Sequence, residues 1–424
     1  MLKNFPFFFG NQMKNMALIV QKYGGTSVAS VEMIRRIARN AARLHRAGNQ
    51  VIIVVSAMGK STDKLLEMMY LQSKEPPERE LDVILSTGEQ VSMSLLSTAL
   101  HTIGVEAVSL TGRQAGIITD SNHTRARILE IEEERILREL QQGKVVVVAG
   151  FQGADKNGEI TTLGRGGSDT TAVALAAAVG ADVCEIFTDV TGVYTIDPHM
   201  VAGARRLPYI SYDEMLEMAN LGARVMHPRA VEMGKKHNIK IHVRSSFAGE
   251  EGTIIREVTS VEEKFIVSGI ACDVDLAKIA IVGVPDKPGI AAKIFNAIAQ
   301  AGISVDLIVQ SIRKEEDNDI LFTVTREDLS KTLSILSDVI KEIEVKEIYH
   351  AEDVAKISII GAGMANAPGV ASTMFNALAE KGINIEIIST SEIKVSCLIK
   401  KDKINDAAEA VHKAFDLGEE SAMA

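Results

Sequence analysis

Short apolar runs separated by longer stretches of helical periodicity fill the first part of the chain, from about residue 17 to residue 246. Nearly continuous apolar strands that alternate with helices are typical of a parallel sheet covered on both faces. Residues 31–47 illustrate the helices, because apolar side chains recur on one face between Ser30, a predicted N-cap, and Gly48, a predicted stop. The pattern predicts an α/β fold with an open, mostly parallel sheet and helices on both faces. The predicted strands are 17–21, 51–55, 145–149, 183–187 and 240–243.

A different pattern begins near residue 262 and occurs twice. A strand, a Pro-Gly turn, an amphipathic helix, a glycine and a second strand follow Lys278, and the same order follows Lys356. Two copies are too few for a solenoid, so the pattern predicts a duplicated α+β module. The residues that recur 80 positions apart are Pro288-Gly289 and Pro368-Gly369, Phe295-Asn296 and Phe375-Asn376, and Gly302 and Gly382.

These patterns divide the chain into four parts. The polar, charged stretch FAGEEGTIIREVTSVEEK is typical of a join between domains. The predicted parts are a domain at 17–246, a linker at 247–264, a first module at 265–345 and a second module at 346–424.

Composition narrows the classes of partner. The 424 residues carry a formal net charge of −10, and aromatic residues make up 4% with no Trp, which argues against nucleic acid or an anionic membrane as the main partner. Cys184, Cys272 and Cys397 form no Cys-x-x-Cys pair, so neither a disulfide framework nor a zinc knuckle is expected. This use of cysteine predicts a protein of the reducing cytoplasm. The opening ten residues are apolar but too short for a membrane span, and they lack a signal-peptide cleavage site.

The stretch 19–30, IVQKYGGTSVAS, places a lysine and two glycines where a predicted strand meets a predicted helix. Glycines let backbone N–H groups approach a phosphate closely, and Lys22 could place a positive charge on a phosphoryl group. A Gly-Gly turn beside an exposed lysine is an equally good interpretation of these residues alone.

The stretch 161–198 carries the strongest local indication of a ligand-binding site. Its LGRGGSD segment surrounds Arg165 with glycines and then opens an Ala-rich helix at Ser168 and Asp169. An arginine fork and helix-start amides favour an anion, although either Ser168 or Asp169 could serve only as the N-cap. TDVTGVYTIDP then follows a predicted strand, at the kind of strand end where open α/β sheets bind ligands.

Other motifs are weaker or fail. GKST at 59–62 lacks the glycine of a P-loop where Val54 stands, and GAGMAN at 361–366 lacks the third glycine of a dinucleotide fingerprint. Glu89 in LSTGEQVS could hold an ammonium group or be an ordinary exposed helix glutamate. His227 precedes Pro228 at a predicted helix start, which favours a structural histidine.

Together these stretches resemble the aspartate kinases, members of the amino-acid kinase family, over nearly the whole chain after residue 17. KYGGTS is similar to the family's opening Lys-Phe-Gly-Gly-Thr-Ser, with Tyr23 in place of Phe, and LSTGE, LGRGGSD, TDVTGVYTIDP and GARVMHP follow in the family's order. The duplicated module resembles a pair of ACT regulatory domains. The resemblance implies that 17–246 is an amino-acid-kinase catalytic domain. It also suggests that the two ACT modules are interleaved, so that strand 265–275, within the first module's range, would complete the second module.

The resemblance implies transfer of the γ-phosphoryl group of ATP to the β-carboxylate of L-aspartate. The product would be 4-phospho-L-aspartate, at the first step toward lysine, threonine and methionine. Such a carboxylate, with an ordinary pKa of about 3.9, is already ionised at neutral pH, so no general base is needed. Catalysis then reduces to positioning and charge neutralisation, which agrees with the lack of a Ser-His-Asp or Cys-His pattern.

The resemblance also assigns roles to individual residues. Lys22 would stabilise the transferring phosphoryl group and Asp169 would orient that lysine. Magnesium would arrive on the ATP phosphates, with no dedicated protein metal site. The residues implied for aspartate are Thr62, Glu89, Arg165, Gly166, Gly167 and Ser168, and those implied for ATP are Lys22, Gly24, Gly25, Thr26, Ser27, Thr188, Asp189, Tyr194, Asp197 and Arg224.

Two positions depart from the family's pattern on the nucleotide side. His199 follows Asp197-Pro198 where the family usually has arginine, which removes a permanent positive charge. Arg224 stands where the family usually has lysine, which keeps the charge and changes its shape.

The ACT resemblance implies feedback by an amino acid, lysine or threonine or both, and pairing of modules in at least a homodimer. Its implied effector residues are Asp286, Gly289, Ala291, Asp306 and Gln310.

Three rival functions stay open at this point. A family member that phosphorylates glutamate, carbamate or a nucleotide would share the glycines, but less readily Glu89, Arg165 and the paired modules. A nicotinamide oxidoreductase with an ACT region lacks the required dinucleotide fingerprint. A catalytically inactive amino-acid sensor would be expected to have lost some of Lys22, Arg165 and Asp169.

Overall fold

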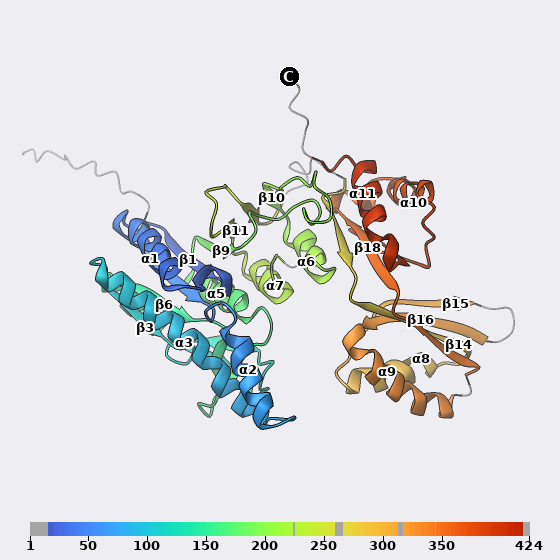
Figure 1. Ribbon diagram of the computed structural model, residues 1–424, viewed down its shortest axis with the longest axis horizontal. Coiled ribbons are helices and arrows are strands. Elements are labelled where there is room, and N and C mark those ends of the chain that lie inside the picture. Colours follow the sequence, from blue (N-terminus) through green and yellow to red (C-terminus); the bar gives the residue numbers. More distant parts are fainter. Residues whose placement is uncertain (1–15, 224, 259–265, 313–316, 344, 419–424) are drawn as a thin grey trace, which may run out of the picture. The chain divides into compact units, whose positions relative to one another are not determined.

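The computed structural model describes residues 16–223, 225–258, 266–312, 317–343 and 345–418, which form two compact units (Figure 1). The first unit holds the described residues up to Val193, together with Pro208–Tyr212 and the stretch from Val225 to Glu257. The second unit holds Tyr194–Leu207, the stretch that begins at Asp213, and the described residues after Glu257. The chain therefore passes between the units several times, and the units do not coincide with two continuous halves of the sequence.

An eight-stranded sheet forms the centre of the first unit. Every neighbouring pair in it is parallel except β11 and β12, as expected for apolar strands joined by helices. All five strands predicted from the apolar runs are present in it. In order across the sheet the strands are β10 (Tyr209–Ile210), β12 (Thr253–Ile255), β11 (Ile241–Ser245), β9 (Val183–Thr188), β1 (Leu18–Tyr23), β2 (Gln50–Val55), β6 (Val145–Ala149) and β3 (Ala107–Leu110).

β12 lies inside the stretch 247–264 that the sequence suggests as a linker. It pairs with both β10 and β11, so part of this stretch is a strand of the main sheet. Three residues are too few to show an apolar periodicity, which explains why the pattern did not indicate this strand. Residues 259–264 of the suggested linker, and residue 265, lie outside the described residues.

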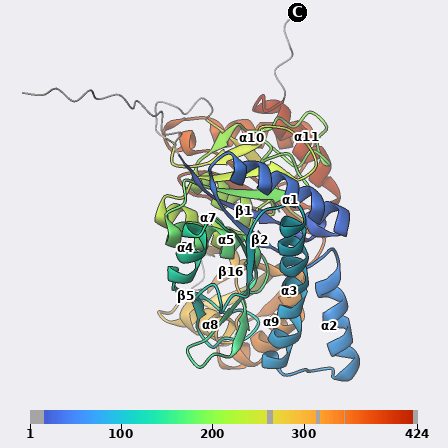
Figure 2. The ribbon, with the colours of Figure 1, turned by 90° about the vertical axis from the view of Figure 1, so that its left-hand side faces the viewer.

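Helices cover both faces of the main sheet. α1 (Val31–Arg46) and α3 (Glu78–Thr102) lie side by side on one face, where they share a core with β1, β2 and β6 (Figure 2). Ser30 caps α1 as predicted, accepting a hydrogen bond from the backbone N of Met33 at 3.3 Å. α5 (Gly167–Val179) packs against β1 and β9 on the other face, beside α7 (Pro228–His237). The many alanines of α5 allow a close approach to the sheet, and its residues 167–176 are all buried.

The remaining elements of the first unit are short. A four-stranded sheet contains β5 (Ile128–Ile131), β4 (Ile117–Thr119), β7 (Gln152–Ala154) and β8 (Ile160–Thr162). The other helices are η1 (Gly25–Val28), α2 (Ser61–Gln72) and α4 (Glu134–Gln141), and α6 (Tyr212–Asn220) begins in this unit and continues in the second.

Two antiparallel sheets with helices form most of the second unit. The first module's sheet has the order β15 (Asp306–Ile312), β16 (Asp317–Thr325), β14 (Leu276–Pro285) and β17 (Glu347–Ala351), with α8 (Ile290–Gln300), α9 (Arg326–Val339) and η2 (Ile340–Glu342). The second module's sheet has the order β13 (Gly269–Asp273), β18 (Val354–Ile360), β20 (Lys394–Lys400) and β19 (Ile387–Thr390), with η3 (Ala362–Asn366), α10 (Val370–Glu380), η4 (Lys401–Lys403) and α11 (Ile404–Ala414).

The two modules exchange their edge strands. β13 precedes the first module in sequence but pairs with β18 of the second, and β17 precedes the second module but pairs with β14 of the first. Each module therefore needs the other's leading segment to complete its sheet.

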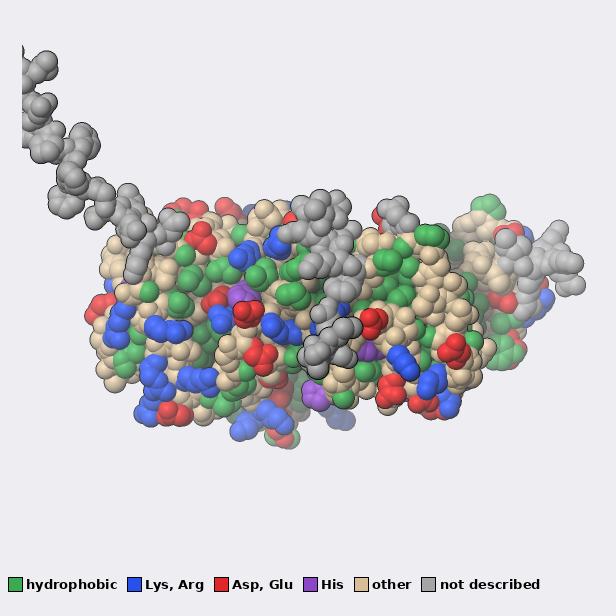
Figure 3. Space-filling model, turned by 90° about the horizontal axis from the view of Figure 1, so that it is seen from above, with side chains coloured by type: hydrophobic (Ala, Val, Ile, Leu, Met, Phe, Trp, Pro, Cys, Tyr) green, Lys and Arg blue, Asp and Glu red, His purple; other side chains and the backbone are tan. Residues whose placement is uncertain are grey.

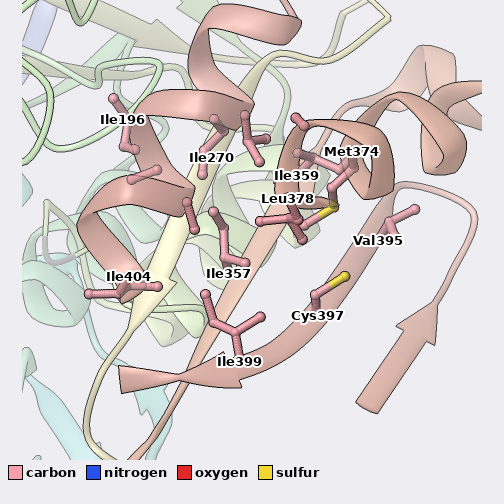
Figure 4. Packing of buried hydrophobic residues seen from close by; sticks show 14 of the residues in the cluster. Ile196, Ile270, Ile357, Ile359, Met374, Leu378, Val395, Cys397, Ile399 and Ile404 are labelled. Atoms are coloured by element: carbon pink, nitrogen blue, oxygen red, sulfur yellow. The ribbon is translucent and has the colours of Figure 1, made fainter. Parts of the chain in front are cut away.

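The second module's core also includes residues from the middle of the chain. Figure 4 shows Ile196 and Ile270 beside Ile357 and Ile359 of β18, over Met374 and Leu378 of α10. The segment 194–207 is held there by backbone hydrogen bonds, from Ile270 N to Thr195 O and from Thr195 N to Arg205 O. A segment that the family resemblance assigns to the catalytic domain is thus part of the second unit's core.

Two equivalent ion pairs join the two modules. Lys278 and Lys356 each lie two residues after the start of the first core strand, on the sheet face that the helices do not cover. Lys356 pairs with Asp306 of the first module, and Lys278 pairs with Glu386 of the second at 2.5 Å. The pairs flank a small apolar cluster that contains Leu276, Leu307, Val354, Ile387 and Leu398.

Lys356 is 2% exposed, and Asp306, whose side chain is 47% exposed, supplies its counter-charge. Burial alone would raise the pKa of Asp306, but the Lys356 ammonium lowers it below its usual value. We expect Asp306→Ala to cost about 3 kcal/mol of unfolding free energy, because it leaves a buried ammonium without its partner. Adding Lys356→Met should recover most of that loss, as measured by urea unfolding.

The exposed pair between Lys400 and Asp353 provides the matched control. Its atoms are 2.7 Å apart, but its side chains are 51% and 67% exposed. Asp353→Ala should therefore cost less than about 1 kcal/mol. Equal losses for Asp306→Ala and Asp353→Ala would contradict the buried-charge argument.

Candidate active site

The candidate site lies at the carboxyl edge of the main sheet. Tyr23, at the end of β1, pairs with Val55 at the end of β2 and with Phe187 near the end of β9, and Val55 pairs with Ala149 at the end of β6. Because these strands are parallel, the loops that follow them meet at one edge of the sheet. These loops carry most of the motifs found in the sequence.

Lys22 and Asp169 form an ion pair at this edge. Lys22 is the penultimate residue of β1, and Asp169 lies in the first turn of α5, which packs on β1. The Lys22 Nζ and an Asp169 carboxylate oxygen are 2.6 Å apart, and each side chain is 12% exposed. The carboxylate holds the ammonium in place, close to the loop after β1.

The two glycines after β1 allow close approach. A Cβ on Gly24 would lie 3.4 Å from Lys22 Nζ, so the absence of a side chain leaves the ammonium open on that side. A Cβ on Gly25 would lie 3.1 Å from the carbonyl oxygen of Ala57 and 3.2 Å from that of Gly59. Gly59 N donates to Gly25 O at 3.0 Å, so this turn packs directly on the loop after β2.

The hydroxyls of the same turn are placed differently. Thr26 is exposed, whereas Ser27 is buried and its Oγ lies 2.6 Å from Ser246 Oγ, beyond the end of β11. The Ser27 hydroxyl is therefore already engaged within the protein.

Glu89 of α3 lies under the loop that follows β2. One of its carboxylate oxygens accepts a hydrogen bond from Ala57 N at 3.1 Å, and the other makes none with any described residue. Burial raises the pKa of Glu89 to about 7. A buried carboxylate oxygen without a donor is unusual in a folded protein and is expected where a ligand supplies the donor. Thr62 lies in the first turn of α2, after the same loop.

The glycine-rich turn before α5 has left-handed backbone. Gly164 and Gly166 have φ of 74° and 68°, and a Cβ on Gly166 would lie 2.2 Å from atoms of the His227 side chain. Gly167 packs on Phe151, and Arg165 is exposed at the turn. The turn brings Ser168 to Gly150, the residue after β6, where a Cβ would lie 2.8 Å from Ser168 Oγ.

His227 has a structural role in this turn. It caps α7, its Nδ1 accepting from Arg229 N at 3.3 Å, and Arg229 donates to the carbonyl oxygen of Leu163 at 3.1 Å. Burial and the nearby Arg229 lower the pKa of His227 below its usual value. Its imidazole therefore acts as a neutral cap that packs on Gly166.

The residues that the resemblance assigns to the nucleotide do not all lie in one unit. Thr188 is the last residue of β9 and Asp189 follows it, both in the first unit, and the Thr188 hydroxyl donates to the Asp189 carboxylate at 3.1 Å. Tyr194 and Asp197 belong to the second unit, where an Asp197 oxygen lies 3.0 Å from His199 Nδ1. Arg224 lies outside the described residues.

The residues assigned to the effector all lie in the first module. Asp286, Gly289 and Ala291 are exposed at the turn into α8, and Gly289 is its left-handed N-cap with φ of 93°. Asp306 and Gln310 lie on β15, and Asp306 is already paired with Lys356.

Several residues that shape the site were not singled out from the sequence. The Ala57 N–H binds Glu89, and Gly88 lets α3 reach that loop, since a Cβ there would lie 2.7 Å from the Ala57 Cβ. Gly150 makes room for Ser168. Gly88 interrupts an otherwise helical pattern, and it was the one sequence signal that could have pointed to the close packing of α3 on the loop after β2.

Among the described residues, no group of three or more His, Cys, Asp or Glu side chains could hold a metal ion. No helix in the same part of the chain is long and apolar enough to cross a membrane.

Comparison with known proteins agrees with this geometry. Residues 17–245 match the amino acid kinase family, and residues 278–343 and 357–415 each match an ACT domain. The chain is 50% identical over 402 residues to an aspartokinase of Bacillus sp. (strain MGA3), which covers 95% of this chain and 98% of that protein.

Two solved structures of an aspartokinase also resemble this chain, at lower sequence identity. Aspartokinase III of E. coli in complex with aspartate and ADP (R-state) has a TM-score of 0.80 at 25% identity, covering 94% of this chain and 100% of that one. The same enzyme in complex with lysine and aspartate (T-state) has a TM-score of 0.73 at 25% identity, covering 94% and 99%.

The raised pKa of Glu89 makes stability depend on pH. Because the folded pKa of about 7 lies above the unfolded value, the folded state binds the proton more tightly, and stability is lost as pH rises through 7. Glu89→Gln removes this loss, so the variant should be about 3 kcal/mol more stable than wild type at pH 8.5. The difference should vanish below pH 4, and urea unfolding at both pH values measures it.

Gly166 and Gly180 begin and end α5 with left-handed backbone, at φ of 68° and 65°. A Cβ on Gly180 meets nothing within 4 Å, whereas one on Gly166 meets the His227 ring. We expect Gly180→Ala to cost about 1–2 kcal/mol from the backbone alone. Gly166→Ala should cost more than about 3 kcal/mol, because it adds a steric clash. Equal shifts of the thermal midpoint would contradict this account of Gly166.

Proposed function

We propose that this chain transfers the γ-phosphoryl group of ATP to the β-carboxylate of L-aspartate. The premise is that the chain belongs to the aspartate kinases of the amino acid kinase family and carries two ACT domains. The bond between the γ-phosphorus and the bridging oxygen breaks, and a bond to a carboxylate oxygen forms. The products are ADP and 4-phospho-L-aspartate. No proton moves in this step, since the attacking carboxylate is already ionised at neutral pH.

The observation that carries the proposal is the Lys22–Asp169 ion pair at the carboxyl edge of the sheet. The ammonium is fixed in position and lies beside Gly24, where no side chain shields it. A fixed cation of this kind can neutralise charge on the phosphoryl oxygens during transfer without first having to move. Gly25 and Thr26 continue the turn along which the phosphates would lie.

Glu89 and the turn before α5 are our candidates for holding aspartate. The free oxygen of Glu89 would accept a hydrogen bond from the substrate's ammonium, whose charge would favour the ionised form of that carboxyl. Arg165 would pair with the α-carboxylate, and Ser168 and Thr62 would add hydroxyl donors. The titration of Glu89 near neutrality then makes aspartate affinity fall as the pH drops below 7.

The nucleotide side of the proposal rests on Thr188 and Asp189 in the first unit, and the family resemblance adds Tyr194, Asp197 and Arg224. Magnesium would be bound by the ATP phosphates and would neutralise their charge. The E. coli relative was solved with ADP and aspartate, which supports ATP as the co-substrate.

The ACT domains support regulation by an amino acid. The E. coli relative was also solved with lysine, so lysine is the first candidate effector and threonine the second. We place the effector at Asp286, Gly289, Ala291, Asp306 and Gln310, in at least a homodimer of a cytoplasmic enzyme. The reaction would be the first step toward lysine, threonine and methionine.

The test is the release of ADP from ATP and magnesium with L-aspartate, with hydroxylamine present to trap the acyl phosphate. We expect Lys22→Ala to reduce turnover by about three orders of magnitude or more, because it removes charge stabilisation in the transition state. Asp169→Asn should reduce it less, since the lysine remains but is no longer held.

Lys381→Ala, at an exposed position after α10, is the control and should leave turnover unchanged. L-Glutamate in place of L-aspartate tests the acceptor. Turnover with glutamate alone would overturn the choice of substrate, and no turnover with either acid from folded protein would point to an amino-acid sensor.

A further inference from the structure

The first unit holds a cavity on the face of the main sheet opposite to Lys22. Side chains alternate along β1, so Gln21 and Tyr23 face α1, whereas Lys22 faces α5. The cavity has a volume of about 290 Å³ and lies between this face of the sheet, α1 and residues 245–249. A volume at the small end of the range for ligand sites suits a small metabolite rather than a nucleotide.

The floor of the cavity is a polar network whose side chains hydrogen-bond to one another. The carboxylate of Glu185, a residue only 8% exposed, accepts hydrogen bonds from Gln21 Nε2 at 2.7 Å and from Arg244 Nη1 at 3.0 Å. Tyr23 donates to Gln21 Oε1 at 3.3 Å, and burial raises the pKa of the Tyr23 hydroxyl, which stays neutral. Phe187 stacks on Tyr23 with ring centroids 4.6 Å apart. The floor is therefore neutral overall and partly aromatic.

The rim is positively charged. Arg36, Asn40 and Arg43 all line the cavity, and their spacing of four and three residues puts them on one face of α1. Arg36 donates to the carbonyl oxygen of Phe247 at 3.1 Å, which links α1 to the segment that closes the cavity. No ion pair between described residues includes Arg36 or Arg43.

The neighbouring arginines of the same helix are engaged elsewhere. Arg35 and Arg39 lie 3.4 and 3.6 Å from Glu32, and neither lines this cavity. Lys and Arg side chains gather at the left of the face seen in Figure 3. Arg36 and Arg43 are exposed at the rim without an ion-pair partner among the described residues, and together over a neutral floor they favour an anionic ligand.

We propose that this cavity is a second binding site, for a small organic carboxylate. The planar guanidinium groups of Arg36 and Arg43 pair with the carboxylate, a geometry that arginine favours. The body of the ligand lies on the neutral floor, against Phe187 and Met33. The floor offers no free charge, so a carboxylate with an apolar or aromatic body fits better than inorganic phosphate.

The cavity also touches the turn after β1 from behind. Ser27 of η1 lines it, and its hydroxyl contacts Ser246, which lines it too. A ligand here adjoins the turn that carries Gly24 and Gly25 and would change the KM for ATP more than that for aspartate. This effect rests on the proposed function, whereas binding itself does not.

The test uses 4-fluorobenzoate and its neutral isostere 4-fluorobenzamide, each titrated into the full chain and followed by ¹⁹F NMR. We expect the benzoate to bind with a Kd of about a millimolar and at least about tenfold more tightly than the benzamide. Arg43→Gln should weaken benzoate binding by about tenfold, as should Arg36→Gln. Saturating ADP and L-aspartate should leave the benzoate bound.

Arg35→Gln is the matched control, one residue from Arg36 on the same helix and outside the cavity. Arg35, Arg36 and Arg43 are all exposed, so the three variants should keep the same fold. Asn40→Trp, which fills the mouth of the cavity, should also abolish binding. Equal binding of the two probes, equal effects of Arg35→Gln and Arg43→Gln, displacement by aspartate, or binding of inorganic phosphate in place of the benzoate would each overturn the proposal.

Discussion

The ion pair between Lys22 and Asp169 is the interaction on which the rest of the site depends. Two charges at 12% exposure are tolerated together because each neutralises the other, and neither would be stable there alone. The pair requires α5 to lie close on β1, which its alanine-rich sequence permits. That closeness in turn sets the left-handed glycine turn before α5 and the position of Ser168. The sheet and α5 thus fix the position of the Lys22 ammonium group, although the lysine side chain itself is flexible.

Much of this arrangement could be predicted from the sequence, for a simple physical reason. Apolar runs mark buried parallel strands, and parallel strands end at one edge, so motifs that follow such runs must meet. Contacts between distant residues could not be predicted in this way. The Ser27–Ser246 contact joins residues 219 positions apart, and the free oxygen of Glu89 depends on which donors the fold leaves nearby. Strand β12 and the small sheet around β4 are too short to produce a periodic signal.

The two modules of the second unit depend on each other in two ways. Each completes its sheet with a strand from the segment that leads into the other, and each supplies an acid to a lysine of the other. Asp306 takes part in this contact and is also a candidate for holding the effector. A ligand that drew Asp306 away would leave Lys356 buried without its counter-charge, and such binding at the first module would then carry an energetic cost in the second.

The chain changes compact unit after residues 193, 207, 212, 224 and 257. This interleaving has an evolutionary consequence. Regulatory domains that hang from a single joint can be gained, lost or traded between enzymes by one recombination event. Here such an event near residue 257 would place a new second module against Ile196 and Ala204 of this chain, which are matched to a different core. Residues 194–207 and the second module are therefore constrained to change together.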